Sequence, residues 1–350
     1  MSIFEDNNIK TTPVSELGEF GLIDHLTKSF KNNNKSTVKG VGDDAAVIEF
    51  SNDQYRLLST DMLVEGVHFD LSYSPLKHLG YKAVSVNVSD ICAMNGRATQ
   101  IMVSVAISNR FPVEAIEELY LGIQLACENY KIDLVGGDTT SSTSGLVISV
   151  SVLGEVEKKK ISYRNGAKLN DLVVVTGDLG AAYLGLQILK REQEIFLSNP
   201  GVQPDLQGND YALQRQLKTE ARANYIKVLD DLNIVPTSMI DISDGLTSEI
   251  LHLSKHSDVG ITIYEDKLPI DYTTMNLAKD LNLNPIFCAL NGGEDYELLF
   301  TISQDHYEKL KKDVDFTIIG HVTDNKEGNN FITKDSTSHP ITAQGWDPLK

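Results

Sequence analysis

The sequence has few cysteines and comparatively few basic residues. Its 350 residues include three cysteines, Cys92, Cys127 and Cys288, which are too few and too scattered for a disulfide framework or a zinc site. Thirty-one lysines and arginines stand against 49 aspartates and glutamates, so the formal net charge is −18. Because such a chain lacks a basic field, we expect no binding to nucleic acid or to an anionic membrane surface.

Long hydrophobic runs are also absent. One of the longest, residues 146–153, contains two serines and is far shorter than the ~20 apolar residues that span a bilayer. The first ten residues, MSIFEDNNIK, have neither the basic start nor the apolar stretch of a secretory signal. We therefore expect a cytoplasmic protein, and at ~150 residues per domain its length indicates two domains.

The spacing of apolar side chains predicts helices and strands in both halves of the chain. In the first half, helices are expected at 15–30, 75–94 and 112–130, and strands at 45–50, 55–60, 99–107, 132–135 (short and buried) and 146–153. In the second half, the expected strands are 172–176, 238–242, 260–264, 298–302 and 316–319, and the expected helices are 179–189, 211–232 and 246–256, with 192–210 as a surface loop. The charged stretch 155–171 separates the halves, so the pattern indicates an α+β protein in two parts.

Six short segments place acidic residues beside glycine, serine, threonine or asparagine. They are 42–46 (GDDAA), 59–61 (STD), 87–90 (NVSD), 136–140 (GGDTT), 241–245 (DISDG) and 291–295 (NGGED). Any one of them alone is typical of a turn or a helix N-cap. Six together favour a site for metal and phosphate, because carboxylates are hard oxygen ligands for Mg²⁺ and glycines let backbone N–H groups approach phosphate oxygens.

The same segments contain no lysine or arginine, so their carboxylates would repel one another if they converged. Either the segments lie apart in space, or divalent metal binds among them. The second interpretation predicts a site for phosphoryl transfer from a Mg²⁺–nucleotide complex.

Other phosphate-binding motifs fit poorly. The P-loop string G-x-x-x-x-G-K-[ST] and the H-R-D and D-F-G strings of protein kinases are absent. Residues 40–45 (GVGDDA) match the loose dinucleotide pattern G-x-G-x-x-A. That match is weak, because the segment follows a polar stretch and leads into an expected strand rather than a helix.

The acidic segments resemble the thiamine-monophosphate kinase family. The strings that carry the resemblance are GVGDDAAV (40–47), STDMLVEGVHF (59–69), YKAVSVNVSDICAMNG (81–96), LVGGDTT (134–140), ISYRNGAKLNDLVVVTG (161–177), MIDISDGL (239–246) and NGGEDYELLFT (291–301). The GGDT-like and SDG-like strings occur throughout the aminoimidazole ribonucleotide synthetase superfamily. His68 after Val-Glu-Gly, together with GGEDYELLF, points to this member.

The resemblance implies a two-domain aminoimidazole ribonucleotide synthetase-like fold of classes α/β and α+β. Its first domain, 1–157, would bind ATP and magnesium and pair its mixed sheet with that of a second subunit. Its second domain, 158–350, would be an α+β domain with substrate contacts. The implied reaction transfers the γ-phosphoryl group of ATP directly to thiamine monophosphate, giving thiamine diphosphate and ADP. It needs several Mg²⁺ ions, and the implied assembly is a homodimer.

Site residues are implied by the same match, position by position. The Mg²⁺ ligands would be Asp44, Thr60, Asp61, Asp90, Asp138, Asp241 and Asp244, with Ser59 acting through its backbone. Contacts to ATP would come from Gly137, Asp138, Arg164 and Ser243, and contacts to thiamine monophosphate from His68, Glu294 and Trp346. Two assignments have a second interpretation: Asp295 could be the functional acid in place of Glu294, and Arg164 could simply bridge the domains.

Three other functions are disfavoured. Selenophosphate synthesis would need a reactive cysteine near the N-terminus, whereas the first cysteine of this chain is Cys92. Hydrogenase maturation would need a C-terminal cysteine, and the chain ends in Asp-Pro-Leu-Lys. A non-catalytic sensor of nucleotide or thiamine phosphate would have no need of the complete set of acids.

Overall fold

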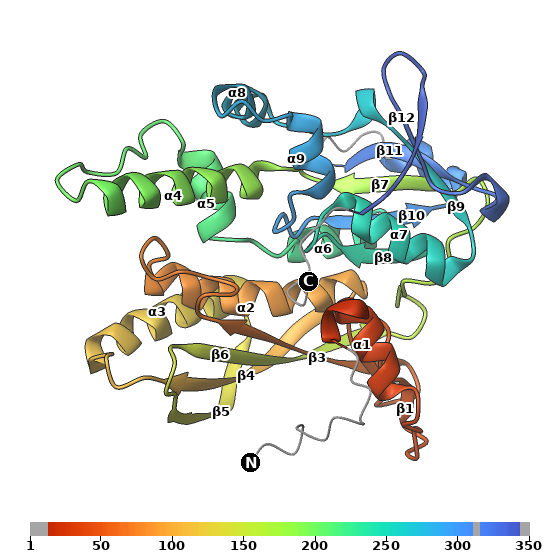
Figure 1. Cartoon of the computed structure of the whole chain (residues 1–350). Helices are drawn as coiled ribbons and strands as arrows, with labels where there is room; N and C mark the ends of the chain where they lie inside the picture. Colours follow the sequence, from red (N-terminus) through yellow and green to blue (C-terminus); the bar gives the residue numbers. More distant parts are fainter. Residues whose placement is uncertain (1–12, 311–315, 344–350) are drawn as a thin grey trace, which may run out of the picture.

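The computed structural model describes residues 13–310 and 316–343, and the first of its two mixed sheets has six strands (Figure 1). The strand order is β1-β2-β3-β6-β4-β5, with β4 and β5 parallel and the other pairs antiparallel. The strands are β1 (Thr37–Lys39), β2 (Ala46–Glu49), β3 (Gln54–Val64), β4 (Arg97–Ile107), β5 (Asp133–Ser141) and β6 (Val147–Glu157).

The second sheet has seven strands in the order β13-β12-β9-β11-β7-β10-β8. They are β7 (Leu172–Thr176), β8 (Ser238–Asp241), β9 (Gly260–Tyr264), β10 (Leu298–Ile302), β11 (Phe316–Thr323), β12 (Asn330–Ile332) and β13 (Ser338–Pro340). Successive residues of a strand face opposite sides. Val174 of β7 accordingly packs in one hydrophobic core, and Val173 and Val175 pack in another.

Helices lie on both sheets. They are α1 (Gly18–Thr27), α2 (Leu76–Ala93), α3 (Val113–Tyr130), α4 (Ala181–Ser198), α5 (Asp210–Leu217), α6 (Ala223–Asp231), α7 (Leu246–Ser257), α8 (Tyr272–Asp280), α9 (Pro285–Asn291) and α10 (Tyr307–Leu310). Across the described residues, none of these helices combines the length and apolar character needed to cross a membrane.

Helix α2 lies between the two sheets and is buried on nearly every side (Figure 1). It packs on β3 and β6 of the first sheet and on β8 of the second. Helix α3 can approach it closely because both helices carry glycine at the crossing: a Cβ added to Gly122 would lie 1.9 Å from the carbonyl oxygen of Lys77. Residues of α2 are therefore held between the two halves of the molecule.

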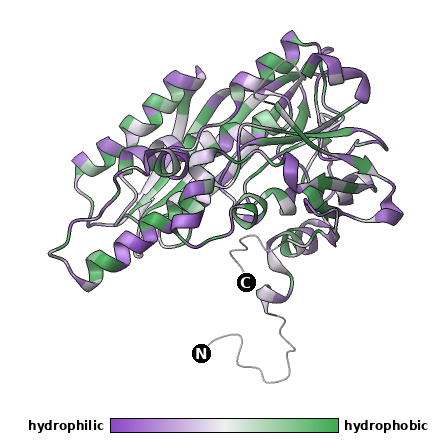
Figure 2. Cartoon of the chain, turned by 90° about the horizontal axis from the view of Figure 1, so that it is seen from above, coloured by the Kyte–Doolittle hydropathy of each residue, from purple (hydrophilic) through white to green (hydrophobic). Residues whose placement is uncertain are grey.

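Within the described part of the chain, one face of the first sheet is left uncovered. Helices α2 and α3 cover the other, and their buried hydrophobic residues share one core with those of the strands. Hydrophobic and hydrophilic residues alternate along many of the helices (Figure 2). On the uncovered face, Leu58, Met62 and Met102 are 40%, 55% and 48% exposed. Exposed apolar side chains that gather on one face, rather than scatter singly, are typical of an interaction surface.

The structure corrects the expected strand 132–135. Strand β5 runs through Gly136 and Gly137 as far as Ser141, and every one of its residues is exposed. The apolar run had indicated burial, but among the strands that the structure describes β5 pairs only with β4 and forms the edge of the sheet. An edge strand lacks a neighbour on one side, which local sequence does not reveal.

The expected elements at 192–210 and 211–232 are also wrong in part. Helix α4 continues to Ser198, so it includes the start of the expected loop. The single expected helix is two, α5 and α6, separated at residues 218–222. The break is held by tertiary contacts, because Tyr130 accepts a hydrogen bond from the N–H of Ala221 and Glu220 accepts one from Tyr81.

The predicted division between residues 157 and 158 stays a prediction. All strands of the first sheet precede it and all strands of the second follow it. Packing does not stop there, however, because one hydrophobic core contains both Val84 of α2 and Phe300 of β10.

Candidate active site

Three carboxylates predicted as metal ligands converge between the sheets. Asp44 precedes β2, Asp90 lies near the end of α2, and Asp241 ends β8. One oxygen from each lies within 4.8 Å of the others. Asp44 and Asp241 are buried, at 7% and 4% exposure. The sequence left open whether the acidic segments lie apart or converge, and the structure brings these three carboxylates together.

Hydroxyl groups and one guanidinium orient this carboxylate cluster. Ser59 donates to Asp90 at 2.5 Å, and Ser89 donates to Asp241 at 2.6 Å. Arg164 donates to both oxygens of Asp44, from Nη2 at 2.7 Å and from Nε at 3.1 Å. Arg164 thus joins the loop before β7 to the loop before β2, which is the bridging role considered above.

The electrostatics of the cluster favour a bound cation. Burial and the neighbouring carboxylates, Asp44 in particular, raise the pKa of Asp241 to about 7. Burial and then Asp61 and Asp241 raise the pKa of Asp90 well above its ordinary value. Burial, Glu19 and Asp44 raise the pKa of Asp61 to about 6. A divalent cation among these oxygens would relieve their repulsion, and an all-oxygen donor set suits Mg²⁺.

Ser59 and Asp61 face the cluster, whereas Thr60 does not. Alternate residues of a strand point to opposite faces, and Ser59 contacts Asp90 on the α2 side of the sheet. Asn87 of α2 accepts a hydrogen bond from the N–H of Asp61 at 3.0 Å. The hydroxyl of Thr60 instead donates to the carbonyl of Val150 at 3.0 Å, on the uncovered face.

Gly137 and Asp138 lie farther away, on the exposed edge strand β5. Asp138 pairs with Ser104, Ser104 with Ser149, and Ser149 with Met62. This row crosses three strand spacings, so Asp138 is about 14 Å from β3 at ~4.8 Å per spacing. Within one chain, Asp138 and Asp61 are therefore too far apart to share one Mg²⁺ ion.

A cavity of about 700 Å³ adjoins the carboxylate cluster. Its lining includes four of the predicted residues, His68, Ser243, Asp244 and Glu294. The strand–loop segment 241–244 carries Asp241 into the cluster and Asp244 into the cavity wall. Phe69, Tyr73, Tyr183 and Phe287 add aromatic surface, so the cavity suits a ligand with flat rings.

Two predicted substrate residues lie close together in this cavity. The N–H of Val64 donates to Nδ1 of His68 at 3.0 Å, so the neutral ring carries its proton on Nε2. Burial lowers the pKa of His68, and the Glu294 carboxylate opposes this shift only in part. The net lowering keeps the imidazole neutral near pH 7. Glu294 forms an ion pair with Lys82 of α2.

Comparison with known proteins decides the family. Residues 42–156 match the family described as AIR synthase related protein, N-terminal domain. The thiamine-monophosphate kinase of Aquifex aeolicus is 37% identical over 95% of this chain and 98% of that protein. The Bacillus subtilis protein of the same name is 35% identical over 95% of this chain and 100% of that protein. This chain belongs to the thiamine-monophosphate kinase family.

A solved structure confirms the family fold. AaThiL complexed with AMPPCP and TMP has a TM-score of 0.81 and 35% sequence identity, covering 97% of this chain and 99% of that chain. The expected aminoimidazole ribonucleotide synthetase-like fold is therefore confirmed. The pairing of the first sheet across a thiamine-monophosphate kinase dimer stays a prediction.

Some site residues were missed or lie outside the described part. Trp346, predicted to stack on substrate, falls beyond the described residues. Lys82 was missed, although it stands out as a charged residue within the apolar stretch 81–88 of α2. Tyr183 and Phe287 were also missed, because they lie far apart in sequence and only the fold brings them to one cavity.

Proposed function

We propose that this protein transfers the γ-phosphoryl group of ATP to the phosphate of thiamine monophosphate. The observation that carries the proposal is the cluster of buried Asp44 and Asp241 with half-buried Asp90 beside an aromatic-lined cavity. In the transfer, a phosphate oxygen of the acceptor bonds to the γ-phosphorus while the bond to the β–γ bridging oxygen breaks. The products are thiamine diphosphate and ADP, and the mechanism is a direct in-line transfer without a phosphoenzyme.

The acidic residues of the chain hold the metal in this proposal. The proposed ligands of several Mg²⁺ ions are Asp44, Thr60, Asp61, Asp90, Asp138, Asp241 and Asp244, with Ser59 acting through its backbone. When bound, Mg²⁺ neutralises the phosphate oxygens and so lowers the repulsion between donor and acceptor. Gly137, Asp138, Arg164 and Ser243 are the proposed contacts to ATP.

Substrate recognition is assigned to the cavity. His68 and Glu294 contact the thiamine part, with Trp346 as a further aromatic contact. Glu294, whose charge is shared with Lys82, is the proposed partner of the thiazolium cation, and His68 lines the same cavity. Because the acceptor is already an anionic phosphate oxygen, the reaction requires no general base. The chain's contribution is then mainly positioning and charge stabilisation.

We also propose that the protein acts as a homodimer. The uncovered face of the first sheet exposes Leu58, Met62 and Met102, and the edge strand exposes Leu134 and Val135 at 45% and 60%. A second copy packed on this face would bury these side chains. Thr60 and Asp138 lie on the same face, so their proposed roles depend on the dimer.

The proposed function is tested by product analysis. Purified full-length protein is incubated with ATP, Mg²⁺ and thiamine monophosphate, with thiamine as an alternative acceptor and a chelator as control. Thiamine diphosphate and ADP should appear in equal amounts, only with Mg²⁺ and only from the monophosphate. Folded protein that binds thiamine monophosphate but yields no diphosphate would instead identify a sensor.

A further inference from the structure

The segment that carries Glu294 has an unfavourable backbone conformation. Between α9 and β10, Gly293, Glu294 and Tyr296 have positive φ angles of 70°, 62° and 49°. Residues with a Cβ rarely adopt this conformation, and they keep it only where the surroundings impose it. Two backbone hydrogen bonds contribute: Glu294 donates to the carbonyl of Ser243 at 2.6 Å, and Tyr296 donates to that of Ile242 at 2.8 Å.

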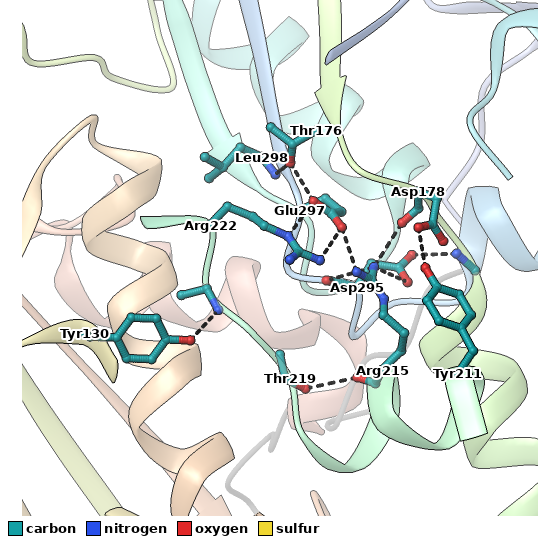
Figure 3. A network of polar contacts seen from close by, with 12 residues as sticks. Tyr130, Thr176, Asp178, Tyr211, Arg215, Thr219, Arg222, Asp295, Glu297 and Leu298 are labelled. Atoms are coloured by element: carbon teal, nitrogen blue, oxygen red, sulfur yellow. Dashed lines mark hydrogen bonds and ion pairs between the residues drawn. The ribbon is translucent and has the colours of Figure 1, made fainter. Parts of the chain in front are cut away.

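Two buried carboxylates, Asp295 and Glu297, flank Tyr296 and fix the segment through hydrogen bonds to other elements. Glu297 is completely buried and accepts from Thr176 at 2.6 Å, from Arg215 at 2.8 Å and from Arg222 at 2.7 and 2.5 Å (Figure 3). Asp295, which is 3% exposed, accepts from the N–H of Gly180 at 2.8 Å. These contacts leave the Glu294 side chain on the cavity side.

The two arginines lie on either side of the break between α5 and α6. Arg215 is in α5, and Arg222 immediately precedes α6. Between them, Glu220 accepts from Tyr81 of α2 at 2.6 Å and from Tyr130 of α3 at 3.0 Å. The break is therefore fixed to the helices of the first sheet, and Arg222 transmits this position to Glu297.

Lys82 closes these contacts into a ring. It follows Tyr81 on α2 and forms an ion pair with Glu294. The ring thus runs from α2 through Glu220, Arg222 and Glu297 to Glu294, and back to α2. It links both halves of the molecule at the residue that faces the cavity.

We propose that Arg222, with Arg215, is a positioning residue for Glu294 in the thiamine-phosphate site. This inference rests on the proposed function, because it assumes that Glu294 contacts thiamine monophosphate. A buried ion network is weak evidence for stability, since well-packed apolar residues often stabilise as well. Its directional contacts instead impose one geometry on a segment whose backbone would otherwise relax.

The kinetic test uses Arg222→Gln, Arg222→Lys and a matched control, Arg191→Gln. Arg191 has a 47% exposed side chain and forms an ion pair with the adjacent Glu192. We expect Arg222→Gln to raise KM for thiamine monophosphate about tenfold with KM for ATP little changed, because misplacing one contact group selectively weakens its ligand. Arg222→Lys should restore part of the loss, and Arg191→Gln should match the wild type.

A second readout does not depend on turnover. Hydrogen–deuterium exchange of the ligand-free protein should be faster at residues 291–297 in Arg222→Gln than in the wild type or Arg191→Gln. If the wild type transfers no phosphate to thiamine monophosphate, the proposed function fails, but the exchange result still tests the ring. Arg222→Lys serves for both measurements if Arg222→Gln does not fold.

Two results would overturn the inference. One is unchanged exchange at residues 291–297 in a folded Arg222 variant. The other is an equal loss of kcat with both substrates and unchanged KM values, because that is the signature of a smaller active fraction rather than of a displaced Glu294.

Discussion

At the scale of single residues, the cluster of Asp44, Asp90 and Asp241 combines burial with like charge. Arg164 neutralises Asp44, but Asp90 and Asp241 receive mainly serine hydroxyls. Two carboxylates without a cationic partner are costly to keep ionised in a buried site. Without a bound cation these carboxylates therefore lower the stability of the fold, whereas a bound cation would offset their charge.

Asp241→Asn should separate these two properties. The pKa of Asp241 is raised from 3.8 to about 7, so its ionisation destabilises the native state progressively between about pH 4 and pH 7. The variant should therefore be more stable than the wild type at pH 8 in chelator, by about 4 kcal/mol. It should also lose turnover by about 10²-fold or more. Urea unfolding and steady-state kinetics measure both, with the exposed Asp231→Asn as control. Wild-type turnover at limiting Mg²⁺ would contradict the ligand assignment.

His252 should make stability depend on pH. It packs against Phe20 with ring centroids 4.3 Å apart, and burial, followed by Arg164, His256 and Lys255, lowers its pKa to about 4. The unfolded chain protonates near pH 6.5, so stability is lost as pH falls from 6.5 to 4, by about 3 kcal/mol in total from this group. Unfolding measured at pH 5 and pH 8 should show a smaller difference in His252→Gln than in the wild type. An equal difference in both proteins would exclude this origin.

At the scale of elements, α2 carries residues for both functional regions. Lys82 faces the cavity near one end, and Asp90 joins the carboxylate cluster near the other. The place of α2 is fixed by α3, since Gly80 and Gly122 allow the two backbones to touch. Helix packing therefore sets the distance between the metal site and the substrate cavity.

Gly122→Ala should disturb this packing. The new Cβ would lie 1.9 Å from the Lys77 carbonyl oxygen and 2.9 Å from the Tyr81 backbone nitrogen, and neither atom can move without shifting α2. We expect a loss of about 2 kcal/mol or more in the free energy of unfolding. Gly21→Ala is the matched control: its Cβ meets only Leu17, at 3.5 Å, and alanine favours a helix by about 1 kcal/mol. Equal unfolding midpoints for the two variants would contradict the tight crossing.

At the scale of the whole molecule, the first sheet has a face that no element among residues 13–310 and 316–343 covers. The proposed second copy would occupy it. Residues assigned to the site lie on both sides of this sheet, with Asp61 on the α2 side and Asp138 in the row of Met62. Assembly and activity are therefore expected to be lost together.

Charge on the uncovered face should separate the copies. We expect Met62→Glu with Met102→Glu to reduce the mass in solution from that of a dimer to that of a monomer, because burying unpaired carboxylates is unfavourable. Light scattering during size-exclusion chromatography gives the mass. Val113→Glu, at a position that is 70% exposed on α3, controls for added charge. A wild-type protein that is already monomeric would refute the homodimer.

Sequence by itself determined the residue types and the local periodicity. The segments that contain Asp44, Asp90 and Asp241 were found because acidic residues beside small ones recur at element ends, and the family resemblance then singled out these three residues. Strands β7, β9 and β10 were predicted because alternation and apolar runs are local signals. The tertiary structure alone decided which groups meet. How distant segments pack determines the ion pair of Lys82 with Glu294 and the ion pairs of Arg215 and Arg222 with Glu297. It also determines the exposure of β5. Such contacts have no local signature, because a cation's partner is set by the fold rather than by its neighbours in the chain.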